Sequence, residues 1–200
     1  MFPLQAVHFP ATVLPLHVFE PRYRELTRRC LAGDGQFGVV LIERGSEVGG
    51  GDVRFDVGTR TRIAQATELP DGRWAMVAVG TGRLRVMRWL PDDPFPQADV
   101  EDVGDERAGT GAPRLRADAA RLLRRCLALR SELGDPAVPA TVELDDDPVV
   151  ASWQIAALAP IGPADAQRVL EAAGPDARLG LLVELLEDTA HLLSWRAAGT

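Results

Sequence analysis

The sequence contains no lysine, so all 22 of its basic side chains are arginine. A Walker A loop requires a lysine on the β- and γ-phosphates, a Ser-Lys protease uses a lysine as its base, and Schiff-base or pyridoxal enzymes need a lysine amine. None of these sites can therefore form within these 200 residues. A GC-rich genome, whose codons favour Arg, Ala, Gly and Pro, is a sufficient cause of the bias.

Cysteine and histidine are also scarce. Cys30 and Cys126 lie far apart in segments with helical patterns, so we expect reduced core residues rather than metal ligands. His8, His17 and His191 form no pair with metal-ligand spacing, and no serine lies in a Gly-x-Ser-x-Gly nucleophile elbow. The sequence thus predicts no catalytic residue, no metal site and no cofactor.

Long hydrophobic runs are missing. No stretch approaches the roughly 20 apolar residues of a membrane span, and the N-terminus lacks the basic and apolar segments of a signal peptide. The composition, 46% hydrophobic and 26% charged, is that of an ordinary folded domain. We therefore expect a cytoplasmic protein that does not contact a membrane.

The net charge of -7 is unevenly distributed. Residues 1–90 carry twelve arginines against nine acidic residues, whereas residues 91–113 carry one arginine against seven. This acidic stretch is rich in Pro and Gly, a composition typical of a boundary. We predict two domains, residues 1–110 and residues 111–200.

The first part has the pattern of short strands. Pro21 opens a helical stretch that extends to Leu31, and Pro70-Asp71-Gly72 is a turn signal. One helix among several short strands favours a small, partly closed β-barrel. The expected strands are 12–19, 37–43, 60–68, 74–79, 83–86 and a short one around 98–103.

The second part has the pattern of amphipathic helices. From Pro113 to Gly134, apolar residues recur in steps of four and three, which indicates a helix packed along its whole length. Further helices are expected over 147–158, 163–173 and from Pro175 onward. The predicted fold class is α+β: a small β-barrel with one or two helices, followed by a three- to four-helix bundle.

One motif is far more specific than these patterns. Phe2-Pro3-Leu4, Phe9-Pro10 and the segment 14–26 (LPLHVFEPRYREL) resemble the opening of the N-terminal, substrate-binding domain of Lon proteases, FPL…FP…LPLxIFExRYxxL. Later landmarks agree in order: 37–40 (FGVV), 57–59 (VGT), 71–73 (DGR) and 82–86 (GRLRV). The resemblance is strong over residues 2–90. Ala11 departs from it, since the family usually has glycine after this proline.

The resemblance implies a PUA-like barrel followed by a helical bundle. Lon proteases carry an ATPase module and a Ser-Lys peptidase domain after this region, so the resemblance implies a stand-alone, non-catalytic protein- or peptide-binding module. Its expected partners are unfolded or extended polypeptides, with a protease or a chaperone as a further partner. A groove between barrel and bundle is expected to bind them, lined by Leu16, Phe19, Tyr23, Trp74, Met76 and Trp153. The same six side chains are also compatible with ordinary core positions.

RNA binding is the alternative, because PUA-like barrels in other families bind RNA and residues 1–90 are slightly positive. A sequence pI near 5.0 and the lack of a basic patch interleaved with aromatic residues argue against nucleic acid. The sequence does not determine the oligomeric state.

Overall fold

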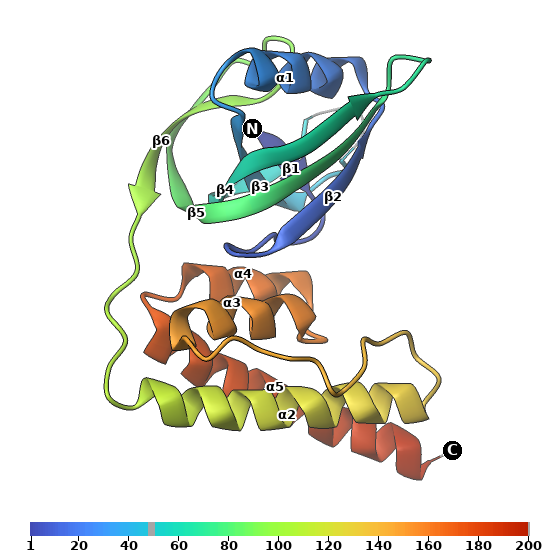
Figure 1. The fold of residues 1–200 in the computed structure, drawn as a ribbon, viewed down its shortest axis with the longest axis vertical. Helices are drawn as coiled ribbons and strands as arrows, with labels where there is room; N and C mark the ends of the chain where they lie inside the picture. Colours follow the sequence, from blue (N-terminus) through green and yellow to red (C-terminus); the bar gives the residue numbers. More distant parts are fainter. Residues whose placement is uncertain (48–50, 200) are drawn as a thin grey trace. The chain divides into compact units, whose positions relative to one another are not determined.

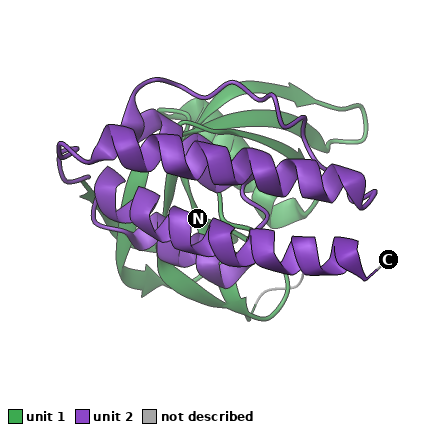
Figure 2. Cartoon of the chain, turned by 90° about the horizontal axis from the view of Figure 1, so that it is seen from below, with its two compact units in different colours: residues 1–104 green, residues 105–200 purple. Residues whose placement is uncertain are grey.

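The computed structural model describes residues 1–47 and 51–199. The chain divides into two compact units, residues 1–104 and residues 105–200 (Figures 1 and 2). All strands of the described chain lie in the first unit together with one helix, and the second unit is helical. The predicted α+β class is confirmed.

The first unit consists of a mixed sheet and helix α1 (Pro21–Ala32). The strands are β1 (Phe2–Leu4), β2 (Val13–Val18), β3 (Gln36–Arg44), β4 (Val53–Glu68), β5 (Trp74–Leu90) and β6 (Gln97–Val103). Their order is β1-β3-β4-β5-β2, and β6 also pairs with β5. Among the ladders of the described residues, only the β1–β3 pair is parallel. Within the described residues no ladder joins the terminal strands β1 and β2, so the sheet is open rather than a closed barrel.

The core of this unit lies between the sheet and α1. Alternate residues of β2 point into it: Leu14 and Leu16 pack against the core and Val18 is fully buried. Tyr23 and Leu26 of α1 complete it from the other side. This packing fixes the register of β2, because a slip by one residue would expose all of its core side chains.

Strand β5 is longer than the sequence predicts. The expected strands 74–79 and 83–86 form one continuous strand, and Gly80 does not interrupt it. The segment before β2 crosses β5 at this glycine: the amide of Gly80 donates to Thr12 O, and a Cβ at Gly80 would lie 2.3 Å from Phe9 O. Gly80 thus permits a close backbone crossing rather than a turn.

Ala11 adopts a left-handed backbone conformation with φ of 57°. This conformation costs an L-residue with a Cβ about 1–2 kcal/mol, which explains why glycine is usual at this position in the resembling family. We expect Ala11→Gly to raise the free energy of unfolding by about 0.5–1 kcal/mol. The substitution relieves the backbone strain, and the greater conformational entropy of the unfolded glycine chain offsets part of that gain. Urea denaturation measures the change. Ala75→Gly, on exposed β5 backbone without positive φ, is expected to lower stability instead, and equal effects would contradict the strain at Ala11.

The second unit contains α2 (Ala112–Glu132), α3 (Pro148–Leu158), α4 (Pro163–Glu171) and α5 (Pro175–Ala198). The four helices of the described residues confirm the predicted bundle, and α2 and α5 pack side by side (Figures 1 and 2). Local signals set their ends. The Asp147 side chain accepts a hydrogen bond from the amide of Val149, and each helix has proline in its first turn.

The division between the units lies a few residues before the predicted boundary at 110. Asp105 pairs with Arg178 of α5, and the Glu106 amide donates to Ala173 O. These contacts attach the end of the acidic stretch to the helical unit. The sequence composition could not reveal them, because both partners lie far away along the chain.

Candidate functional site

The solvent-facing side of β2 is unusually apolar. Its odd-numbered residues point away from the core, and two of the apolar ones are largely exposed: Val13 by 64% and Phe19, directly after the strand, by 53%. The solvent face of an antiparallel sheet is normally polar. We define the β2 outer face as Val13, Pro15, His17 and Phe19 together with Ala75 and Val77 of β5.

Register explains how these residues come together. Pro15 pairs with Val77 and His17 pairs with Ala75, so each pair shares one side of the sheet. On the other side of β5, Val77 pairs with Gln65. A pocket of about 430 Å³ lies along this surface, lined by Pro15, Leu16, His17, Gln65, Thr67, Ala75, Met76 and Val77.

Strand β2 also has an edge that no described strand occupies, since its ladder is with β5. The Gly80 amide donates to Thr12 O at the start of this ladder. Antiparallel pairing alternates, so the main-chain groups of Val13, Pro15 and His17 point away from β5, toward the free edge. Pro15 fits there because its missing N–H breaks no ladder bond. Val13 and His17 leave donors and acceptors for an added strand.

Five of the six predicted lining residues belong to the first unit, and the sixth, Trp153, belongs to the second. Leu16, Tyr23, Trp74 and Met76 belong to the core cluster of the first unit, where Tyr23 and Met76 are buried and Leu16 and Trp74 are half-buried. Phe19 is exposed, and it lines a small pocket with Leu16 and Tyr23. Trp153 is buried in the helical unit beneath the guanidinium of Arg178.

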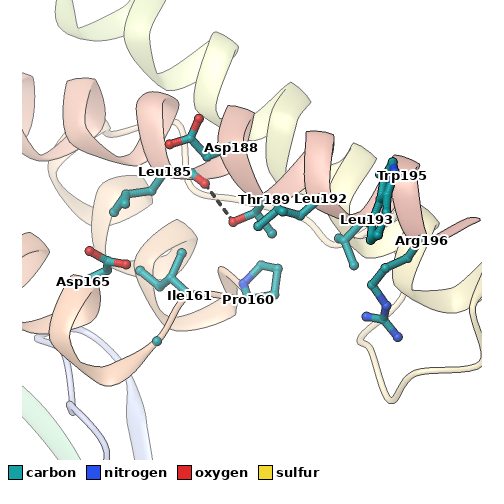
Figure 3. A pocket seen from close by; sticks show the side chains of 11 residues that line it. Pro160, Ile161, Asp165, Leu185, Asp188, Thr189, Leu192, Leu193, Trp195 and Arg196 are labelled. Carbon is teal, nitrogen blue, oxygen red and sulfur yellow. Dashed lines mark hydrogen bonds between the residues drawn. The ribbon is translucent and has the colours of Figure 1, made fainter.

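A second pocket, of about 540 Å³, lies in the helical unit beside α5. Figure 3 shows Pro160 and Ile161 on one side of it and Leu185 and Leu192 of α5 on the other. Leu192 is 65% exposed and Trp195 is 78% exposed. The sequence predicted a helix from Pro175 onward but did not indicate this surface. The available signal was a second apolar stripe at heptad spacing, which runs through Leu181, Leu185, Leu192 and Trp195.

The histidines do not assemble a catalytic arrangement in the described chain. His8 is buried, and desolvation lowers its pKa to about 4, so it is neutral at physiological pH. His17 is exposed on the β2 outer face, and His191 is exposed on α5. No cluster of three or more His, Cys, Asp or Glu side chains able to hold a metal occurs among the residues described.

The acidic stretch neutralises arginines of the sheet. Strand β6 places Glu101 opposite Arg85 and Asp99 opposite Arg88, with the closest atoms 3.7 and 2.6 Å apart. Asp102 pairs with Arg60 of β4 at 2.6 Å. The positive charge of residues 1–90 is thus compensated locally, which does not favour phosphate binding along these strands.

In the part of the chain that the structure describes, no helix is both long enough and apolar enough to span a membrane.

Comparison with known proteins agrees with the fold. Residues 1–188 match the family of the ATP-dependent protease La (LON) substrate-binding domain. Lon protease 2 of Myxococcus xanthus is 29% identical over 192 residues, 94% of this chain and 23% of that protein. Lon protease of Anaeromyxobacter dehalogenans is 28% identical over 94% of this chain and 22% of its own length. The chain therefore spans about a quarter of the length of these relatives.

Two solved structures are similar to the whole fold. A Lon N-terminal domain protein from Xanthomonas campestris superimposes with a TM-score of 0.66 at 28% identity, covering 92% of this chain and 95% of the other. The N-terminal domain of the Mycobacterium avium complex Lon protease gives 0.67 at 19% identity, which shows likeness of fold, over 93% and 97% of the two chains. With the family match over residues 1–188, these findings establish that the chain belongs to the Lon substrate-binding domain family.

Proposed function

We propose that this protein is a non-catalytic module that binds unfolded or extended polypeptide at the β2 outer face. The observation that carries the proposal is the exposure of Val13 and Phe19 beside the edge of β2 that no described strand occupies. An extended segment can add to such an edge through main-chain hydrogen bonds and place alternate side chains in neighbouring pockets. Membership of a substrate-binding family supports a polypeptide as the ligand.

The six predicted lining residues have different roles in this proposal. Phe19 contacts the bound polypeptide directly, whereas Leu16 lines both pockets that contain β2 residues. Met76 lies at the base of the larger pocket. Tyr23 and Trp74 hold β2 in register from the core. Trp153 supports the helical unit, so we do not assign it a contact with polypeptide.

Replacing Phe19 by aspartate is expected to weaken polypeptide binding by about tenfold or more, because the bound state would bury a charge against an apolar segment. The probe is fluorescently labelled, reduced and carboxymethylated α-lactalbumin, which is permanently unfolded, and anisotropy gives its Kd. Met87→Asp is the matched control, since Met87 is 61% exposed in the same unit but lies outside the β2 outer face.

Strand addition has a second, independent signature. Hydrogen exchange at the Val13 and His17 amides should slow when the probe binds, because these groups point to the free edge of β2. Equal weakening by Phe19→Asp and Met87→Asp, or unchanged exchange at both amides, would contradict binding at this surface.

The proposal also includes the cellular location of the protein and its partner. A cytoplasmic location is supported by the free thiols of Cys30 and Cys126. A protease or chaperone that receives the bound polypeptide is the partner such a module would serve. The absence of lysine supports a non-catalytic role for these 200 residues, because the Ser-Lys and Walker A chemistries of a Lon enzyme both require one.

A further inference from the structure

We propose that the pocket beside α5 binds Trp195 of a second copy of this chain, so that two α5 helices pack antiparallel around a two-fold axis at Leu192. This inference concerns the helical unit alone and does not depend on polypeptide binding by the sheet.

The pocket has the shape of a hole for a side chain from a facing helix. Four of its lining residues, Leu185, Asp188, Thr189 and Leu192, occupy positions i, i+3, i+4 and i+7 of α5. Such a diamond of side chains is what receives a knob in helix–helix packing. Pro160 and Ile161 deepen the hole on one side (Figure 3). A volume of about 540 Å³ accommodates a large aromatic side chain.

The same helix presents a suitable knob. Trp195 is 78% exposed, and Leu192, one turn earlier, is 65% exposed. Two large apolar side chains this exposed on adjacent turns form a patch of the kind that marks an interaction surface. Tryptophan is also the residue type most enriched among side chains that dominate binding energy.

Spacing along α5 makes the hole and the knob self-complementary. The diamond of four side chains is centred three to four residues before Leu192. Trp195, which lines the C-terminal end of the same pocket, lies three residues after Leu192. When two copies meet antiparallel with Leu192 at the axis, each Trp195 therefore faces the hole of the other copy. An isologous contact of this kind closes as a dimer and does not grow further.

Charge fits the same register. Asp188 lies four residues before Leu192 and Arg196 lies four residues after it, so each carboxylate faces the guanidinium of the other copy. Asp188 is exposed and lies on the wall of the pocket. Arg196 donates to Asp135 at 3.0 Å, and its side chain is 50% exposed, so a carboxylate of the second copy can approach it. A parallel arrangement would lose both pairs.

Sedimentation velocity of the full chain over a wide concentration range tests the proposal. We expect a monomer–dimer equilibrium with micromolar Kd. Trp195→Ala should raise this Kd by about tenfold or more, whereas Met87→Ala, which removes another exposed apolar side chain, should leave it unchanged. A chain that stays monomeric, or a dimer insensitive to Trp195→Ala, would overturn the proposal.

Charge reversal tests the register itself. Asp188→Arg and Arg196→Asp should each weaken the dimer, because like charges then face each other across the axis, and the double variant should restore it. If the double variant dimerises as weakly as the single variants, the antiparallel register is wrong. If species larger than a dimer form, the two-fold contact is wrong. If the chain is monomeric and Trp195→Ala instead abolishes binding of carboxymethylated α-lactalbumin, the pocket binds polypeptide and the second copy is rejected.

Discussion

Replacing Trp153 by alanine is expected to lower the free energy of unfolding of the helical unit by about 3–5 kcal/mol. The indole is 4% exposed and lies beneath the guanidinium of Arg178, so the substitution leaves a cavity and also removes a cation–π contact. Urea denaturation followed by far-UV circular dichroism measures the loss, because most of the helical signal comes from this unit.

The matched control is Trp195→Ala, which removes the same side chain from the surface of the same unit. At sub-micromolar protein concentration its effect is expected to stay within about 0.5 kcal/mol. Similar losses for the two variants would show that Trp153 does not serve as a core residue. The comparison also decides between the two roles that the sequence left open for Trp153, a ligand contact or a core position.

Helix boundaries in the second unit could be predicted because local chemistry sets them. The Asp147-Pro148 pair caps and starts α3, and Gly134 follows the end of α2 with φ of 74°. Each signal acts within a few residues, so a linear sequence contains it. By contrast, the parallel pairing of β1 with β3 joins distant segments of which one is only three residues long. No local pattern indicates such a pair.

The candidate site was harder to predict for the same reason. Residues 12–19 are apolar at almost every position, so the sequence does not reveal which side of the strand is buried. Pairing with β5 decides it: Leu16 and Val18 face the core, and Phe19 is left exposed. The sequence therefore indicated the strand that carries the candidate site, while the distinction between core and exposed residues required the sheet.

The helical unit also buries a charged side chain, and removing a charge from water costs free energy unless the charge is paired. The guanidinium of Arg178 is 0% exposed, and it is held by the Asp105 carboxylate at 2.8 and 3.0 Å and by the Ser152 hydroxyl at 2.7 Å. Asp105 is itself partly exposed and can be hydrated from outside. The two partners are therefore unequal: loss of the carboxylate leaves a charge away from water, and loss of the guanidinium does not.

Replacing Asp105 by alanine should consequently lower the free energy of unfolding by about 3–5 kcal/mol, the usual result of leaving a buried charge uncompensated. Asp102→Ala is the control, because its carboxylate is 77% exposed and its pair with Arg60 should contribute less than about 1 kcal/mol. Adding Arg178→Met to Asp105→Ala should restore much of the lost stability, since an apolar side chain of similar length removes the stranded charge. If the double variant is no more stable than Asp105→Ala, the loss does not arise from removing the carboxylate partner of the buried guanidinium.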